Sequence, residues 1–256
     1  RLLSSTRKLE LKFVFLSGLS LGLIAFTSMY YLYMTLLFAA IFGVAYVCFT
    51  RFTILRNKYF WLRLVSAGLI SLPFLYFALK PFISLSNTGV LDSRSIEYAA
   101  TYSASPTDFF LPASDHFLFG QLVSKWFDHS LWNESSLYIG TITILLACIA
   151  LILNKKNVHR GLIWSALVVI FFSILLGLGI NLHWNNQDVI VKLPPVLQSM
   201  TGKDELPLYL PAAWLFKHLP FFDIMRTIMR FGFFAAFFTT ILAGLGFAQI
   251  QESIPK

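Results

Sequence analysis

Two arginines, Arg226 and Arg230, stand four residues apart in the segment FFDIMRTIMRF, and an apolar run follows directly. Residues at this spacing share one face of a helix. Two guanidinium forks on one face can hold a phosphate or pyrophosphate through bidentate hydrogen bonds. The segment therefore predicts a binding site for a phosphorylated head group. The alternative is that both arginines reach toward a polar interface and that Arg226 pairs with Asp223, three residues earlier.

Two acids, Asp108 and Glu134, are the candidates for catalysis because apolar residues surround them in the sequence. Carboxylates serve as general bases and as ligands of hard cations, which leaves open a divalent metal such as Mg or Mn as a cofactor. Asp108 could equally be a turn residue, and Glu134 could complement the positive end of a following helix. His116 and His129 match no known metal motif in their spacing, so no metal site is predicted.

The composition indicates that lipid surrounds most of this chain. Of the 256 residues, 57% are hydrophobic and 12% are charged, whereas soluble domains carry about 25% charged residues. The net charge of +8 comes from basic residues that lie between apolar runs, and they form no basic stripe with exposed aromatic residues. This excludes a nucleic-acid partner and makes membrane lipids the expected surroundings. The two cysteines, Cys48 and Cys148, lie inside apolar runs and imply no disulfide.

The apolar runs predict an all-α, polytopic bundle with about six transmembrane helices in one transmembrane domain, residues 1–256. The uncharged run from Phe13 to Phe49 is too long for one crossing, since a single helix would reach about 55 Å, so it must turn near Thr27–Tyr31. Pro73 and Lys80 are expected to kink and to end the third helix. The predicted helices are 11–28, 31–50, 64–79, 137–153, 162–180 and 231–250.

The charges between these helices predict the topology. Segments 1–12, 51–63 and 154–161 hold 11 of the 20 basic residues, and the long loops 81–136 and 181–229 hold ten of the twelve acids. Because Lys and Arg collect on the cytoplasmic side, the long loops should face outward and both ends of the chain inward. Proline and aromatic residues in the outer loops predict folded segments, including a short interfacial helix from Pro211 to Leu219.

Three blocks resemble bacterial polytopic membrane proteins of the GT-C glycosyltransferase type, especially YfhO-like and dolichyl-phosphate-mannosyltransferase-like proteins. They are YSASPTDFFLPASDHFLFG from Tyr102 to Gly120, Glu134 with Leu137-Tyr138-Ile139-Gly140, and LPFFDIMRTIMRFGFF from Leu219 to Phe234. The resemblance covers most of the chain as a later part of the membrane domain. It adds His116 and Tyr138 as outer-face candidates and implies location in a bacterial cytoplasmic membrane.

By this resemblance, the protein would use a polyprenyl-phosphate-linked sugar at the outer membrane face. Such enzymes carry an acid in the first outer loop, but the first outer connection here, Thr27–Tyr31, has none. Either the catalytic part precedes Arg1 or the chain does not catalyse, so enzyme activity stays open. The alternatives are a lipid or polysaccharide transporter or flippase, which the near absence of charges inside the helices disfavours, and a non-catalytic membrane scaffold.

Overall fold

The computed structural model describes residues 11–50, 52–86, 94–127, 134, 136–153 and 160–253. The chain divides into two compact units, one made of residues 1–92 and 160–165 and the other of residues 93–159 and 166–256. Most of the first and last basic segments used to predict the topology, 1–12 and 154–161, lie outside the described residues, as does His129.

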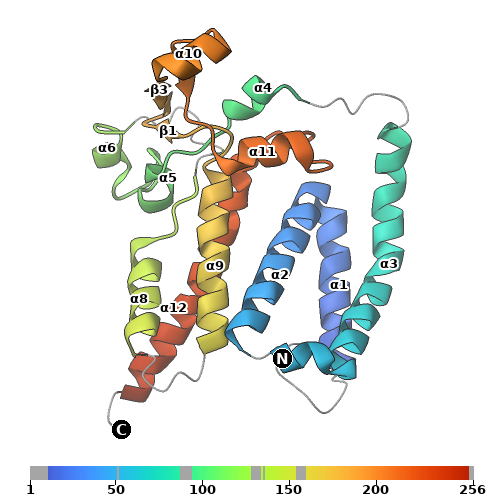
Figure 1. The fold of residues 1–256 in the computed structure, drawn as a ribbon. Coiled ribbons are helices and arrows are strands. Elements are labelled where there is room, and N and C mark those ends of the chain that lie inside the picture. The colour runs from blue at the N-terminus through green and yellow to red at the C-terminus, as the bar shows by residue number, and fades with distance from the viewer. Residues whose placement is uncertain are drawn as a thin grey trace. The chain divides into compact units, whose positions relative to one another are not determined.

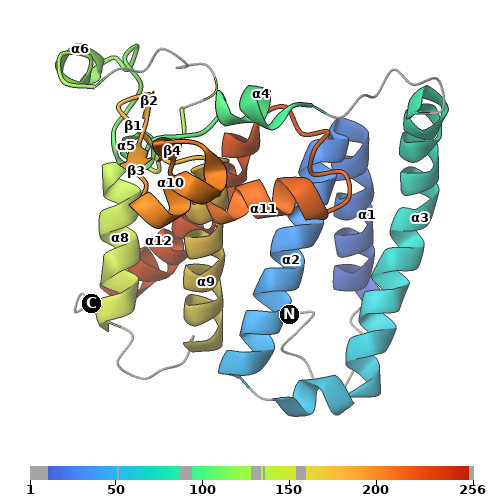
Figure 2. The same ribbon diagram turned by 45° about the horizontal axis from the view of Figure 1, so that its top comes forward.

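The first unit contains the apolar helices α1 (Leu11–Thr27), α2 (Met29–Phe49) and α3 (Lys58–Ser86), with the short 3-10 helix η1 (Phe52–Arg56) before α3. Ser28 interrupts the helical path with extended backbone, at φ −168° and ψ 131°. The break falls in the turn expected from Thr27 to Tyr31, so the division of the long uncharged run into two helices is confirmed. Figures 1 and 2 show α1 between α2 and α3.

Two glycines allow α1 to pack closely on α3. A Cβ added at Gly18 would lie 2.5 Å from the Ala67 carbonyl oxygen, and one added at Gly22 would lie 2.6 Å from the Phe74 ring. The two glycines are four residues apart, which is the small-residue spacing that lets membrane helices approach backbone to backbone. The outer surface of α3 remains apolar, with Leu64, Leu69 and Phe77 more than half exposed, as a lipid-facing helix requires.

α3 extends beyond the predicted range 64–79 at both ends. It begins at Lys58, where the Asn57 side-chain oxygen accepts the Tyr59 backbone N–H at 3.0 Å and caps the first turn. It continues past Lys80 and contains both Pro73 and Pro81. The predicted end at Leu79 was therefore wrong, because a proline inside a long apolar helix can be accommodated by local backbone adjustment.

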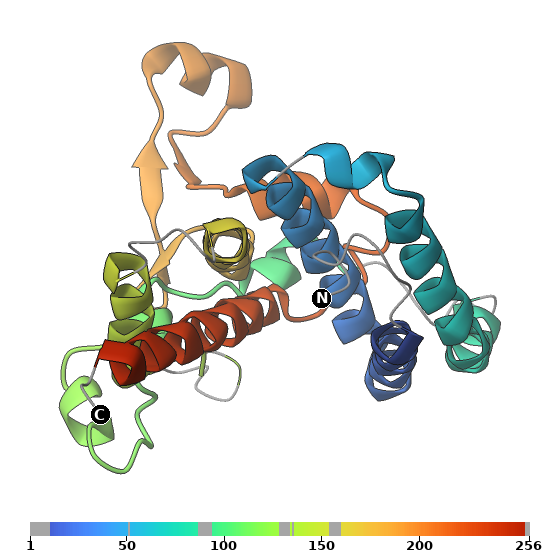
Figure 3. The ribbon, with the colours of Figure 1, turned by 90° about the horizontal axis from the view of Figure 1, so that it is seen from below.

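The second unit contains α8 (Thr141–Leu153), the part of α9 (Arg160–Gly177) from Ala166 onward, and α12 (Phe233–Ser253), which follows the 3-10 helix η2 (Ile228–Gly232). A Cβ added at Gly246 of α12 would lie 1.9 Å from the Leu146 carbonyl oxygen of α8. The two helices therefore touch backbone to backbone, and Figure 3 shows α8 beside the C-terminal half of α12.

Two predicted helix ends are corrected by glycines with positive φ. α8 starts at Thr141 instead of Leu137, because Gly140 adopts φ +94° and the Ile139 N–H donates to the Phe109 carbonyl oxygen at 3.1 Å. α9 ends at Gly177 instead of Ile180, and Gly179 follows with φ +86°. Only glycine adopts this conformation without strain, so each position ends the helical path.

Among the residues that the structure describes, four helices are long and apolar enough to cross a membrane: Met29–Phe49, Lys58–Leu85, Arg160–Gly177 and Ile228–Ser253. Leu11–Thr27 and Thr141–Leu153 are apolar but shorter. The structure is thus helical, and its long apolar helices are compatible with an integral membrane protein, whereas the predicted number of about six spans is not confirmed.

Most of the described segments of the predicted outer loops fold into short elements of the second unit, which Figure 1 shows around the start of α8 and the end of α9. The helices are α4 (Ile96–Ala100), α5 (Thr107–Phe110), α6 (Gly120–Val123), α10 (Pro195–Thr201) and α11 (Pro211–His218). Two antiparallel pairs join β1 (His183–Trp184) to β2 (Gln187–Asp188) and β3 (Ile190–Lys192) to β4 (Glu205–Pro207). The fold is therefore not strictly all-α, while the helix predicted over 211–219 is confirmed.

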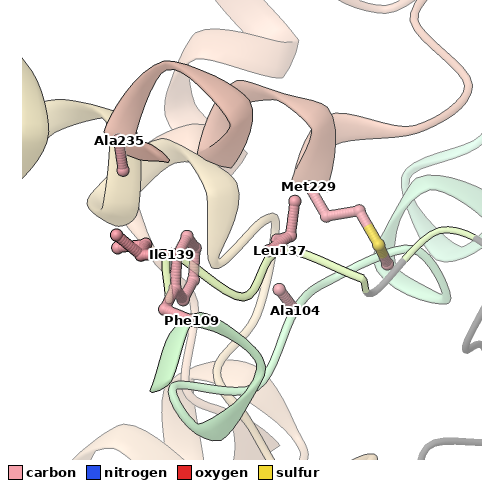
Figure 4. Close-up of a cluster of buried hydrophobic side chains, with 6 residues drawn as sticks. All are labelled: Ala104, Phe109, Leu137, Ile139, Met229 and Ala235. Atoms are coloured by element: carbon pink, nitrogen blue, oxygen red, sulfur yellow. The ribbon is translucent and has the colours of Figure 1, made fainter. Parts of the chain in front are cut away.

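A buried cluster ties these short elements to the long helices of the second unit. Phe109, at the end of α5, is fully buried among Ala104, Leu137, Ile139, Met229 and Ala235. Figure 4 shows its ring next to the Ile139 side chain. The cluster contains residues from the Ser103–Phe110 segment, the extended Leu137–Ile139 segment, η2 and α12. It therefore fixes the positions of these segments relative to one another.

Candidate functional site

Four side chains form an arginine–tyrosine cluster: Arg94, Tyr98, Tyr102 and Arg226. The first three are spaced four residues apart, with Tyr98 in α4, Arg94 just before that helix and Tyr102 in the turn after it, and their side chains contact one another in sequence. The Ser95 hydroxyl oxygen accepts the Tyr98 backbone N–H at 3.1 Å and caps α4. The Arg94 backbone N–H donates to the Asp223 carbonyl oxygen at 3.1 Å, which joins this segment to the turn that carries Arg226.

Each arginine of the cluster contacts one tyrosine ring. Arg226 Nη2 donates to the Tyr102 hydroxyl at 3.2 Å, and its guanidinium carbon lies 5.4 Å from the Tyr102 ring centroid. The Arg94 guanidinium lies 5.1 Å from the Tyr98 ring centroid, and the two tyrosine rings are 5.5 Å apart. These are cation–π distances. The cluster thus holds two guanidinium cations, each against the ring of a tyrosine.

Hydrogen bonds inside the cluster shift two pKa values. The Tyr98 side chain and then Arg226 lower the pKa of the Tyr102 phenol below its ordinary value, because both stabilise the phenolate oxygen. The bond to Tyr102 raises the pKa of Arg226 above its ordinary value. Arg226 is exposed and, among the residues that the structure describes, no carboxylate forms an ion pair with it. It therefore stays cationic and accessible to an anion.

Arg226 and Arg230 do not lie on one helical face, which corrects the sequence prediction. Arg226 lies in a bend, and Thr227 with φ −125° and ψ 90° separates it from η2, which holds Arg230. The two arginines have separate partners, because Arg226 donates to the Tyr102 hydroxyl while Arg230 donates to Glu134. The alternative pairing of Arg226 with Asp223 is absent from the described ion pairs, since the Arg226 side chain turns to Tyr102.

Arg230 is held by Glu134. Its Nε donates to one Glu134 oxygen at 3.0 Å and its Nη2 to the other at 2.7 Å. The pair is bidentate and partly buried, with side-chain exposures of 38% and 23%. This geometry occupies the guanidinium fork and the carboxylate together. Two candidates predicted for different roles, phosphate binding and catalysis, are therefore partners of each other.

Asp108 acts as a turn residue in this structure. Its Oδ2 accepts the Ser105 backbone N–H at 2.9 Å, and its side chain is buried. This side-chain bond closes the turn that leads into α5. The turn holds α5, and with it the fully buried Phe109, in place.

His116 and Tyr138, the other two candidates, meet at the start of α8. Their rings contact edge to face, with centroids 6.3 Å apart. His116 Nδ1 lies 3.3 Å from the backbone N–H groups of Leu118 and Phe119 and accepts from them. The Tyr138 hydroxyl accepts the Thr141 N–H at 3.0 Å and caps α8. Both side chains organise the loop around α8.

Sequence reasoning did not identify Arg94, Tyr98 and Tyr102 as site residues, although their i, i+4, i+8 spacing was visible. Among the described residues, no three His, Cys, Asp or Glu side chains come together as a metal site. Comparison of the chain with protein-family models, curated proteins and solved structures gives no match. The resemblance to GT-C glycosyltransferases therefore stays a prediction.

Proposed function

We propose that this chain is the carrier-binding part of a membrane-embedded, glycosyltransferase-like protein that uses a polyprenyl-phosphate-linked sugar. In this proposal the long loops face the outside of a bacterial cytoplasmic membrane and both chain ends face the cytoplasm. The observation that carries the proposal is the exposed Arg226, which is bound to Tyr102 and has no carboxylate partner among the described residues.

The position of Arg226 along the chain supports a lipid phosphate as its ligand. Arg226 precedes by two residues the apolar helical stretch Ile228–Ser253, which is long enough to cross a membrane. A guanidinium at the end of such a stretch lies at head-group level, where lipid phosphates are found. We assign the phosphate contact to Arg226 with Arg94, because the Arg230 fork is already engaged by Glu134.

The positions of the acids favour binding over bond breaking as the role of this chain. Asp108 holds a backbone turn and Glu134 holds Arg230. A general base needs a carboxylate that can reach the reacting proton, and both carboxylates make contacts that fix the fold. The catalytic acid of the proposed reaction is then expected outside these two residues.

The change Arg226→Ala tests the proposal. Farnesyl phosphate is titrated against the detergent-purified protein, and farnesol, which has the same tail without a phosphate, is titrated in parallel. Loss of a charged, bidentate phosphate contact is worth about 1.5–3 kcal/mol, so we expect binding of farnesyl phosphate to weaken about 10- to 100-fold. Binding of farnesol should stay unchanged, because its tail does not contact the guanidinium.

Lys217→Ala is the matched control, since it removes one exposed positive charge from the end of α11 without touching the arginine–tyrosine cluster. It should change binding of farnesyl phosphate less than about twofold, as expected for a screened surface charge. If Lys217→Ala and Arg226→Ala weaken binding equally, the attraction is a general charge effect, and Arg226 is not a phosphate ligand.

A further inference from the structure

A pocket lined by both polar and apolar side chains lies beside α4, on a different face of that helix from the arginine–tyrosine cluster. Its volume is about 480 Å³, which suits a small ligand. Glu97 and Thr101 of the α4 segment form one wall, and His183, Asp188 and Tyr209 contribute to the other. All of these residues belong to the second unit.

The β1–β2 hairpin explains how the second wall forms. Asn185 and Asn186 connect the strands with φ of 51° and 61°, as a two-residue turn with positive φ at both positions requires. The resulting register places His183 directly opposite Asp188. Cross-strand neighbours are close enough for side chains to pair, and His183 Nε2 lies 2.7 Å from Asp188 Oδ1. His183 is buried in this pairing.

Several hydrogen-bond donors of the pocket are already used within the chain. The Asn181 amide nitrogen and His183 Nε2 both bond Asp188 Oδ1. The Thr101 hydroxyl donates to the Tyr98 carbonyl oxygen at 2.7 Å. The acceptors of the pocket are less engaged, because Glu97 is exposed and has no ion-pair partner among the described residues, and both bonds to Asp188 fall on one oxygen. A ligand that fits must therefore bring donors.

The charges of the residues that line the pocket also favour a ligand that brings hydrogen-bond donors. Two carboxylates line the pocket, and none of its described lining residues is Lys or Arg, although the whole chain carries a net charge of +8. Anions are repelled by such a lining. The Tyr209 ring, half exposed at the pocket, adds an aromatic face of the kind that attracts cations.

We propose that this pocket binds the ammonium group of a small organic ligand between Glu97, Asp188 and the Tyr209 ring. An ammonium group supplies three N–H donors and one positive charge, which matches the unused acceptors and the negative lining. Ile96 and Ile180 also line the pocket and provide apolar contact for the carbon stem of the ligand. The inference is independent of the phosphate site, since it uses none of the four residues of that cluster.

The test uses the full chain in nanodiscs of phosphatidylglycerol, which contains no amine, and ligand-observed NMR titrations. Ethanolamine and glucosamine represent a lipid head group and an amino sugar as sources of the ammonium group. N-acetylglucosamine is the matched uncharged control, because it keeps the sugar ring and loses the ammonium. We expect at least one of the two amines to bind at least tenfold more tightly than N-acetylglucosamine, and the tighter of the two identifies the source.

Two variants place the binding in the pocket. Glu97→Gln changes an exposed side chain and should weaken amine binding at least tenfold, and Asp188→Asn should do the same. Glu205→Gln, which alters an exposed acid of β4 outside the pocket, should change it less than twofold. Binding of both amines no tighter than that of N-acetylglucosamine, binding of calcium without either amine, or an unchanged affinity in Glu97→Gln would overturn the proposal.

Discussion

Replacing Gly246 with alanine is expected to separate α8 from α12 and to destabilise the second unit by about 3 kcal/mol, the upper end of the cost of overpacking. The added Cβ would lie 1.9 Å from the Leu146 carbonyl oxygen and 3.0 Å from the Ala150 backbone nitrogen. Backbone atoms cannot rotate away as a side chain can, so the helices themselves must move. The thermal unfolding midpoint of the detergent-purified protein should fall by about 6–12 °C, by analogy with soluble domains of similar size.

Gly244→Ala provides the control within the same helix. A Cβ at Gly244 meets nothing within 4 Å, and alanine favours helix over glycine by about 0.8–1.0 kcal/mol. This variant should therefore match or exceed the stability of the parent protein. Equal midpoints for the two variants would show that α8 and α12 do not pack at Gly246.

Phe109→Ala is expected to destabilise the second unit by about 3–5 kcal/mol, since it empties the centre of a buried cluster. The Phe109 ring is fully buried, and an added Cβ at Gly232 would lie 2.7 Å from it, so the ring fills space up to the backbone of η2. The thermal unfolding midpoint should fall, and protease cleavage between Ser103 and Tyr138 should accelerate because the segments around the cluster lose their anchor.

Phe110→Ala removes the same side chain one position later, where the ring is 55% exposed. Its unfolding midpoint should stay within about 2 °C of the parent protein, as expected for a surface change of about 0.5 kcal/mol. An equal loss of stability in both variants would contradict the assignment of Phe109 to the core.

The long helices could be read from the sequence because uncharged apolar runs of helical length have few alternative structures. Their ends were harder to predict, since they depend on contacts made elsewhere in the chain. The Asn57 cap extended α3 backward, and the bond from Ile139 to the Phe109 carbonyl oxygen kept the Leu137–Gly140 segment out of α8. Neither the Asn57 cap nor the contact with Phe109 can be predicted from the apolar periodicity of the helix whose start it sets.

The candidate site was only partly predictable for the same reason. Arg226 and Arg230 were rightly noticed as two cations before an apolar helix, but their partners Tyr102 and Glu134 are 124 and 96 residues away in sequence. Arg226 lies in a bend before η2, and Arg230 lies inside it, so the two arginines do not share one helical face. The four-residue spacing of Arg94, Tyr98 and Tyr102 is visible in the sequence. Their contact with Arg226 depends on the tertiary fold and could not be predicted from that spacing.

Photo-crosslinking with a polyprenyl phosphate that carries a diazirine next to the phosphate tests most directly whether Arg226 belongs to a phosphate-binding site. The full chain in native membranes is irradiated with this probe, and the labelled peptides are identified by mass spectrometry. We expect adducts in peptides that contain Arg94–Tyr102 and Phe221–Arg230, with labelling removed by excess unlabelled polyprenyl phosphate. Labelling confined to Leu11–Ser86, or labelling that the excess phosphate does not reduce, would contradict a phosphate site at Arg226.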